Sequence, residues 1–286
     1  MPLRNVPVFF SPEMSVLVES ESPSSGKPAK VVEAWRKTGI PLGIMKPVPV
    51  TAETLSLAHD PAYVQGILAG KIKNGFGNKS LDVAASLPFT TGTMLSAARE
   101  ALHNGMTAVA PCSGFHHADY SSAFGYCTFN GLMVTACALK QEGLVSRVGI
   151  LDFDMHDGDG TQAIIERIHA EDWVEHYSAG KEYLHHSQAR EFLERINEYV
   201  EAMRDCDVIL YQAGADPHIN DPLGGWLTTE QLAERDHLVF SAARRLGVAI
   251  AWNLAGGYQI DAEGGIGRII EIHNNTLLAC ADVFLI

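Results

Sequence analysis

Short apolar runs alternate with helix-length segments along most of this 286-residue chain. The run Val148–Leu151, for example, precedes a segment of helical spacing over residues 161–169, after which another strand-like segment follows. The expected strands cover residues 6–10, 107–110, 148–151, 174–178, 208–211 and 248–252. The expected helices cover residues 29–38, 52–59, 61–69, 92–103, 130–142, 161–169, 188–204, 228–246 and 266–280. Because strands separated by helices pair in parallel through right-handed crossovers, we expect a three-layer αβα fold with a mostly parallel sheet.

Composition favours one globular domain over residues 1–286. Hydrophobic residues make up 47% of the chain, and no low-complexity, Pro-rich or like-charge block divides it. The formal net charge of -13 argues against a nucleic-acid binder, which needs clustered Lys and Arg. The five cysteines are odd in number and form no C-x-x-C pair, as is typical of reduced thiols in a cytoplasmic protein. Without a charged leader or a long apolar run, neither secretion nor a membrane location is expected.

Polar side chains follow four of the expected strands. His116 and His117 come after one, and the acidic stretch Asp152–Asp159 comes after another. Asp216 and Tyr258 follow two more, each directly behind a Gly-containing segment. In open parallel sheets, ligands bind beyond the carboxyl ends of the strands. The four segments are therefore expected at one edge of the sheet, around one site.

The acidic stretch predicts a metal site. Asp154 and His156 are two residues apart and point the same way in an extended chain, and Asp216 joins them from another strand end. Together they offer O, N and O donors and leave a ligand position open for water, as in catalytic zinc sites. The two hard oxygens also suit Fe²⁺ or Mn²⁺. The alternative is a solvated acidic turn that caps the helix expected from Thr161.

The remaining polar residues suit the chemistry of an activated water. His116 and His117 are candidates for the base, and Asp152 and Asp159 are close enough in sequence to orient imidazoles. Tyr258 follows two glycines and has a hydroxyl that can donate to a developing oxyanion. The alternatives are a core histidine for one member of the pair and an ordinary half-buried tyrosine for Tyr258.

Several segments, in this order and spacing, resemble the arginase/deacetylase-fold zinc-dependent deacetylases, a family that includes histone deacetylases, acetylpolyamine amidohydrolases and acetoin-utilization proteins. The segments are Gly114-Phe115-His116-His117-Ala118, Gly125-Tyr126-Cys127-Thr128-Phe129-Asn130, Asp152-Phe153-Asp154-Met155-His156, Gly158-Asp159-Gly160, Gly214-Ala215-Asp216, Asp221-Pro222-Leu223-Gly224 and Gly256-Gly257-Tyr258. The similarity covers nearly the whole chain. It implies the arginase/deacetylase fold, a single deacetylase-like catalytic domain and the removal of an acyl group from an amine.

The resemblance also implies two cation sites. Asp154, His156 and Asp216 would bind zinc. A potassium ion would lie beside them, held by Asp152, by the backbone carbonyls of Asp154 and His156, and by Ser178 on the next strand. Zn²⁺ and K⁺ are therefore the expected cofactors.

By the same resemblance, His116 and His117 are the general base and acid, and Tyr258 is the hydroxyl that polarises the substrate carbonyl. Asp152 and Asp159 would orient His116 and His117, respectively. We therefore expect hydrolysis of an acetyl amide, such as acetyl-lysine or an acetylpolyamine, by zinc-activated water.

The substrate channel is less well defined by the resemblance. Gly125, Tyr126 and Leu223 would line it. Tyr183 is our assignment for the aromatic residue that faces Tyr126. The sequence departs from the family at Asp157, where a second histidine usually follows the histidine ligand. This departure and the short loop after Ser178 put substrate specificity in question more than the chemistry.

Two other functions remain open. A ureohydrolase with two manganese ions uses acids and histidines on similar strand ends, but would need further bridging ligands. A catalytically silent relative that binds an acyl ligand or a partner protein is the other, because Asp157 adds a negative charge near the metal. The expected substrate is a small-molecule or peptide N-acetyl amine, and a homo-oligomer is compatible with the sequence.

Overall fold

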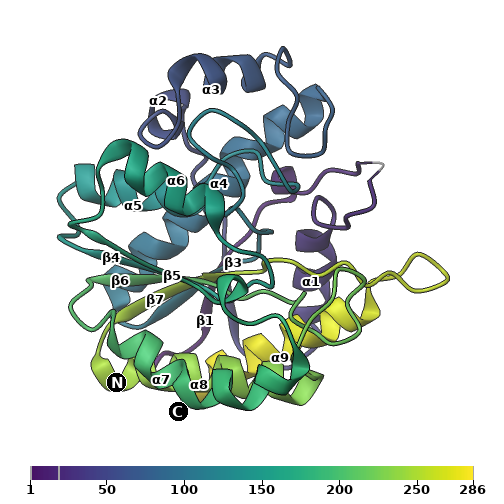
Figure 1. The fold of residues 1–286 in the computed structure, drawn as a ribbon, viewed down its shortest axis with the longest axis vertical. Coiled ribbons are helices and arrows are strands. Elements are labelled where there is room, and N and C mark those ends of the chain that lie inside the picture. The colour runs from purple at the N-terminus through teal and green to yellow at the C-terminus, as the bar shows by residue number, and fades with distance from the viewer. Residues whose placement is uncertain (1, 19, 286) are drawn as a thin grey trace.

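Seven parallel strands form the central sheet of the computed structural model, which describes residues 2–18 and 20–285 (Figure 1). Their order across the sheet is β2-β1-β3-β7-β6-β4-β5, and every neighbouring pair is parallel. The strands are β1 (Val6–Phe9), β2 (Leu42–Met45), β3 (Thr107–Ala110), β4 (Val148–Asp152), β5 (Val174–Ser178), β6 (Val208–Gln212) and β7 (Ala249–Asn253). The predicted α/β class and parallel sheet are confirmed.

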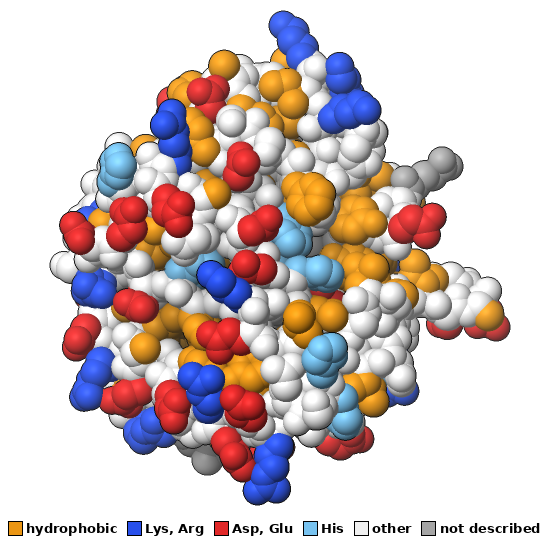
Figure 2. Space-filling view, in the orientation of Figure 1, with side chains coloured by type: hydrophobic (Ala, Val, Ile, Leu, Met, Phe, Trp, Pro, Cys, Tyr) orange, Lys and Arg blue, Asp and Glu red, His pale blue; other side chains and the backbone are white. Residues whose placement is uncertain are grey.

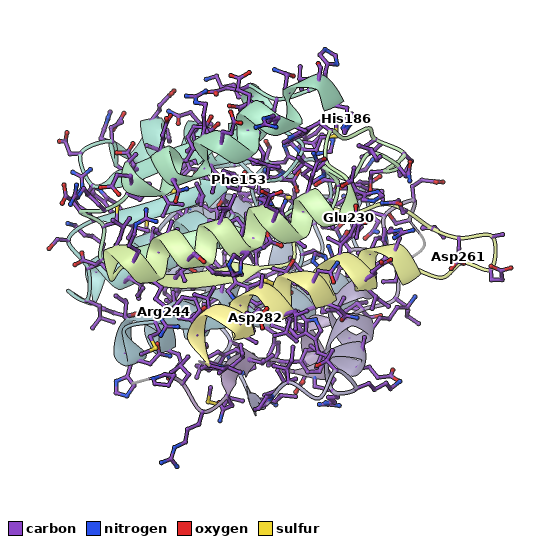
Figure 3. All side chains as sticks on the ribbon, turned by 90° about the horizontal axis from the view of Figure 1, so that it is seen from below. Phe153, His186, Glu230, Arg244, Asp261 and Asp282 are labelled. Atoms are coloured by element: carbon purple, nitrogen blue, oxygen red, sulfur yellow. The ribbon has the colours of Figure 1, made fainter. Side chains whose placement is uncertain are left out.

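Helices cover both faces of the sheet and complete the three predicted layers (Figure 1). They are α1 (Lys27–Trp35), α2 (Ala52–Leu55), α3 (Pro61–Leu68), α4 (Leu81–Asn104), α5 (Gly131–Gln141), α6 (Asp159–Ile168), α7 (Ala189–Glu201), α8 (Thr229–Leu246) and α9 (Gly267–Phe284). One face carries α4, α5 and α6, and the other carries α1, α7, α8 and α9, with α8 and α9 side by side (Figure 3). None of the described helices is long and apolar enough to cross a membrane.

The central strands β4 and β6 are apolar up to their last residue because both faces of the sheet are buried there. Ile150 and Leu210 point into the core beneath α4, α5 and α6, whereas the next residues along the chain, Leu151 and Tyr211, point into the opposite core. All four side chains are fully buried. Successive strand side chains alternate between faces, so burial of both faces produces a continuous apolar run. Burial of each such side chain contributes roughly 2 kcal/mol to folding.

The largest differences from the expectation concern α4 and β2, while α2 ends four residues earlier and α9 four residues later than expected. Helix α4 begins at Leu81, not at residue 92, because Ser80 caps it by accepting a hydrogen bond from the N–H of Val83. Its interior contains Pro88, a residue that usually ends a helix and so hides the first turns in the sequence. Strand β2 was not expected, because it is only four residues long and lies half-exposed at the edge of the sheet.

Thr228, with Gln231 three residues later, is the sequence pattern of a capping box, and the structure confirms this prediction at the start of α8. Thr228 Oγ1 accepts a hydrogen bond from the N–H of Gln231 at 3.3 Å, and Gln231 Oε1 accepts one from the N–H of Thr228 at 2.9 Å. Ser187 directly precedes the helix expected over residues 188–204, and the sequence predicts it as the N-cap of that helix, which is wrong. A 3-10 turn over His186–Gln188 comes first, so that Gln188 occupies the cap position.

We expect Thr228→Ala to lower the free energy of unfolding by about 1 kcal/mol, because the first turn of α8 loses an acceptor for its N–H groups. The measurement is denaturant unfolding followed by circular dichroism. Ser241→Ala, inside the same helix, is the control and should be neutral or slightly stabilising. If the Thr228→Ala protein is as stable as the parent, the capping box does not stabilise α8.

Candidate metal centre and active site

Four neighbouring strands bring the predicted site residues together. Strands β3, β7, β6 and β4 are adjacent in the sheet, and all are parallel, so the loops that follow them meet at one edge (Figure 1). These loops carry the paired histidines, Tyr258, Asp216 and the Asp154-Met155-His156 segment, in that strand order. The predicted shared edge is therefore present.

Asp154, His156 and Asp216 form a compact donor cluster. One potential ligand atom from each lies within 4.8 Å of the others. His156 Nδ1 lies 3.1 Å from Asp154 Oδ1 and 3.0 Å from Asp216 Oδ2. Both carboxylates are buried, and the imidazole is about one-third exposed, which leaves the cluster open from the histidine side.

Two glycines allow the loops of the cluster to touch. A Cβ on Gly214 would lie 2.5 Å from the Cα of Asp154, so the loops after β6 and β4 are in direct contact. Gly256 has φ +51°, and a Cβ there would lie 2.1 Å from Asp216 Oδ1. Any larger residue at either position would displace a proposed ligand.

The cluster has the properties of a cation site. Asp216 Oδ2 is buried and has no hydrogen-bond partner among the described residues, although His156 Nδ1 lies 3.0 Å from it. Burial and then the charge of Asp154 raise the pKa of Asp216 to about 7. The adjacent carboxylates of Asp154 and Asp216 raise the pKa of His156 to about 10. Two crowded carboxylates and an imidazole are a suitable O, N, O donor set for a divalent metal ion.

The two histidines have different electrostatic environments although their ring centroids are only 4.1 Å apart. His116 is buried, and its Nδ1 lies 2.7 Å from Asp152 Oδ2. Burial alone would lower its pKa, but the charges of Asp152 and Asp154 outweigh burial and raise the pKa to about 9. His117 Nδ1 lies 2.8 Å from Asp159 Oδ1. Burial and the charge of His116 lower the pKa of His117.

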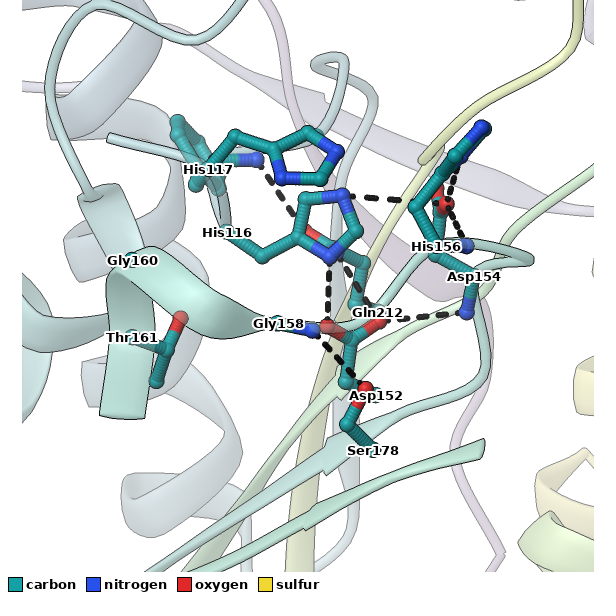
Figure 4. A network of polar contacts seen from close by, with 12 residues as sticks. His116, His117, Asp152, Asp154, His156, Gly158, Gly160, Thr161, Ser178 and Gln212 are labelled. Atoms are coloured by element: carbon teal, nitrogen blue, oxygen red, sulfur yellow. Dashed lines mark hydrogen bonds and ion pairs between the residues drawn. The ribbon is translucent and has the colours of Figure 1, made fainter. Parts of the chain in front are cut away.

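Asp152 is the centre of a buried hydrogen-bond network (Figure 4). Its Oδ1 accepts hydrogen bonds from the N–H of Asp154 at 3.1 Å and from Gln212 Nε2 at 2.9 Å, while Oδ2 faces His116. The other end of the Gln212 amide accepts a hydrogen bond from the N–H of Phe115. Gln212 therefore connects β6 to both the metal loop and the histidine loop, a role that its position in an apolar strand did not reveal.

The loop that bears Tyr258 is held from two sides. Asp221 Oδ2 accepts a hydrogen bond from the N–H of Tyr258 at 2.8 Å, and its Oδ1 accepts one from the N–H of Leu223. Lys27 Nζ, fully buried at the start of α1, donates to the carbonyls of Leu254 and Gly256. Neither Asp221 nor Lys27 was expected to have a role, because each makes backbone contacts that only the fold creates.

Tyr126 and Leu223 lie beside Tyr258 in a surface groove. Gly125 and Tyr126 both have positive φ, +53° and +65°, which turns the Tyr126 ring toward the site. This ring lies 5.8 Å from the Tyr258 ring and 5.9 Å from the Phe76 ring. Leu223 is 49% exposed at the rim of the groove.

The assignment of Tyr183 to the channel is wrong. Tyr183 is 1% exposed and packs in the core against Trp226, since the short loop after β5 turns inward. Phe76 and Phe124 are the aromatic residues next to the site, the latter 5.5 Å from the His117 ring. On the surface, histidine side chains are visible near the middle of this face, among apolar and acidic side chains (Figure 2).

Ser178 lies directly opposite Asp152 in the β4–β5 register, and its Oγ accepts a hydrogen bond from the N–H of Gly158 at 2.9 Å. The two side chains predicted to bind potassium therefore lie side by side at the carboxyl edge of the sheet. Asp157 is half-buried and lines a groove with Asp159 and Ser178. It is not part of the donor cluster.

The histone deacetylase domain model matches residues 22–179 and 171–273. An uncharacterized protein of Picosynechococcus sp. is 30% identical over 255 residues, which are 80% of this chain and 82% of that protein. Histone deacetylase 2 of Arabidopsis thaliana is 28% identical over 199 residues, which cover 63% of this chain and about half, 51%, of that protein.

The fold has a solved counterpart in the acetylpolyamine aminohydrolase of Burkholderia pseudomallei. The two structures have a TM-score of 0.74 over 98% of this chain and 99% of the other, at 18% sequence identity. This similarity shows the arginase/deacetylase fold. Because the domain model spans most of its length, this chain belongs to the histone deacetylase family.

Proposed function

We propose that this protein is a zinc-dependent amidohydrolase that removes an acetyl or other acyl group from an amine, such as acetyl-lysine or an acetylpolyamine. The convergence of Asp154, His156 and Asp216 beside a histidine pair and a tyrosine is the observation that carries the proposal. Membership in the histone deacetylase family supports the same class of reaction.

Asp154, His156 and Asp216 would hold the metal ion. Zn²⁺ is the proposed ion because O, N and O donors in a three-ligand site suit it, and Fe²⁺ and Mn²⁺ accept the same donors. When bound, such an ion supplies a Lewis acid for the amide carbonyl and lowers the pKa of a water molecule. The unpaired oxygen of Asp216 supports this assignment.

His117 is the proposed proton carrier. Because its Nδ1 is bonded to Asp159, Nε2 is free to accept a proton from water and to return it to the departing amine. Its lowered pKa keeps it neutral at neutral pH. The raised pKa of His116 favours a charged imidazolium, which we propose stabilises negative charge and does not act as the base. Return of the proton is essential, since an amine anion is a poor leaving group.

Tyr258 is the proposed donor to the substrate oxygen. Burial, followed by the charges of Asp216 and Asp154, raises the pKa of its hydroxyl far above the usual range, so the hydroxyl keeps its proton. A protonated hydroxyl can donate a hydrogen bond to the oxygen that becomes negative as water attacks the carbonyl. The hydrogen bond that the N–H of Tyr258 donates to Asp221 fixes the backbone from which this hydroxyl extends.

Two further assignments complete the proposal. Potassium would be held by Asp152, by Ser178, and by the carbonyls of Asp154 and His156, and the Asp152–Ser178 register supports this choice. Gly125, Tyr126 and Leu223 would line the acyl-amine channel, which their position beside Tyr258 supports.

Among residues 2–18 and 20–285, one group of three side chains has donor atoms close enough together to hold a metal ion. This favours a single catalytic ion over the two-manganese ureohydrolase site, for which Asp157 would be needed as a ligand. Measurable turnover of an acyl amine would exclude the catalytically silent alternative.

We expect zinc-loaded protein to deacetylate members of a panel of acetyl-lysine peptides and acetylpolyamines, and Tyr258→Phe to lower kcat by about 100-fold with little change in KM. The reason is that the hydroxyl would act mainly in the transition state. Tyr120→Phe, outside the site, is the matched control. If Tyr258→Phe turns over as fast as the parent protein, the role given to Tyr258 is wrong.

The pH profile tests the role of His117. The acid limb of kcat/KM should have its midpoint below the ordinary histidine pKa of about 6.5, because burial lowers the pKa of His117. The contact with Asp159 raises that pKa, so Asp159→Asn should move the limb to still lower pH. Asp157→Asn, on the same loop, should leave it in place. A limb that shifts upward in Asp159→Asn would refute the assignment.

A further inference from the structure

Arg235 is a fully buried arginine on the inner side of α8, the helix that runs from near Glu230 to near Arg244 in Figure 3. Its Nε donates to Asp236 Oδ1 at 2.8 Å, and both side chains are at most 1% exposed. A buried ion pair seldom adds net stability over an apolar pair, since both charges lose their hydration. The presence of this ion pair beneath the edge of the sheet that carries the candidate site therefore needs another explanation.

The other contacts of Arg235 reach the two metal loops. Nη1 donates to the carbonyl of Phe153 at 3.2 Å and to the carbonyl of Gly214 at 2.7 Å. Phe153 directly precedes Asp154, and Gly214 lies two residues before Asp216. A single guanidinium nitrogen thus joins the ends of β4 and β6 at the points from which two proposed ligands extend.

Without a nearby positive charge, the contact between the loops after β4 and β6 would be electrostatically unfavourable. The loops are so close that a Cβ on Gly214 would lie 2.8 Å from the carbonyl oxygen of Phe153. Two backbone carbonyls thus converge on one side of the contact, and the carboxylates of Asp154 and Asp216 converge on the other. Buried oxygens that converge in this way repel each other unless a donor or a positive charge lies between them.

Arg235 is itself held firmly through Asp236. Tyr211 on β6 donates to Asp236 Oδ1 at 2.5 Å, and Thr276 on α9 donates to Oδ2 at 2.6 Å. The guanidinium therefore has its position fixed by the sheet and by the helix next to α8. A rigidly held donor of this kind can fix the positions of the loops it contacts.

We propose that Arg235 is a positioning residue for the metal centre: it holds the Asp154 and Asp216 loops in their metal-binding arrangement before an ion arrives. The inference rests on the metal site proposed above. Arg235 makes no hydrogen bond to a proposed ligand side chain, and its direct contacts with the two loops are those to the carbonyls of Phe153 and Gly214. Without Arg235 the two loops could separate. Zinc binding would then have to bring the two carboxylates together, which would lower the affinity of the site for zinc.

The test compares zinc dissociation constants, measured by competition with a chromogenic chelator, for four proteins: the parent, Asp236→Asn, Arg235→Lys, and the double variant Arg235→Met/Asp236→Asn. The double variant removes both charges and so avoids an unpaired buried aspartate. Asp236→Asn removes the negative charge, but its amide oxygen can still accept the hydrogen bonds from Arg235 Nε and Tyr211, so the guanidinium stays in place and keeps both carbonyl contacts. This variant is therefore the matched control. Denaturant unfolding of each metal-free protein reports stability separately.

We expect zinc binding to weaken by about 10- to 100-fold in the double variant and by less than that in Arg235→Lys, whose ammonium cannot reproduce the planar guanidinium contacts. Asp236→Asn should be less stable than the parent but should bind zinc within about twofold of it. Equal zinc affinity of the parent and the double variant, or an equal loss in Asp236→Asn, would overturn the proposal. If the double variant does not fold, an Arg235→Lys protein that binds zinc as tightly as the parent would likewise overturn the proposal. A parent protein that binds no zinc would instead overturn the proposed metal centre, and this inference with it.

Discussion

Two buried carboxylates, Asp154 and Asp216, converge at the carboxyl edge of the sheet, and much of the surrounding structure compensates for their repulsion. His156 lies between them, with Nδ1 about 3 Å from each. Buried positive charges lie behind them: Lys27 contacts the loop after β7, and Arg235 contacts the loops after β4 and β6. Burial lowers the pKa of Lys27 to about 8, and the charges of these carboxylates oppose that effect. The edge is therefore arranged around a position where a cation is favoured.

The charged neighbours of the two adjacent histidines give them different pKa values. The charges of Asp152 and Asp154 raise the pKa of His116 against the effect of burial, whereas burial and the charge of His116 lower the pKa of His117 against the effect of Asp159. Neighbouring groups whose environments push their pKa values apart are suited to different steps of one reaction. Proton transfer and charge stabilisation can then be divided between adjacent imidazoles.

The parallel sheet and the clustering of site residues could be predicted because both follow from local patterns: apolar runs at strand spacing, and polar side chains directly after them. The residues that support the site could not be predicted in this way. Gln212 lies in an apolar strand and Arg235 in an ordinary-looking helix, and only the tertiary fold shows that both are buried against the site loops. The assignment of Tyr183 to the channel was wrong because the sequence does not distinguish an aromatic residue that lines a channel from one that packs in the core.

The central claim is that Asp154, His156 and Asp216 bind one catalytic metal ion. Anomalous diffraction at the zinc edge, from crystals of the zinc-loaded protein, tests it most directly. The account predicts one strong anomalous peak per chain, at bonding distance from all three side chains and about 2.0–2.2 Å from their N and O donors. A chain without a peak at this position, or with a second metal peak bridged to the first through Asp157, would contradict it.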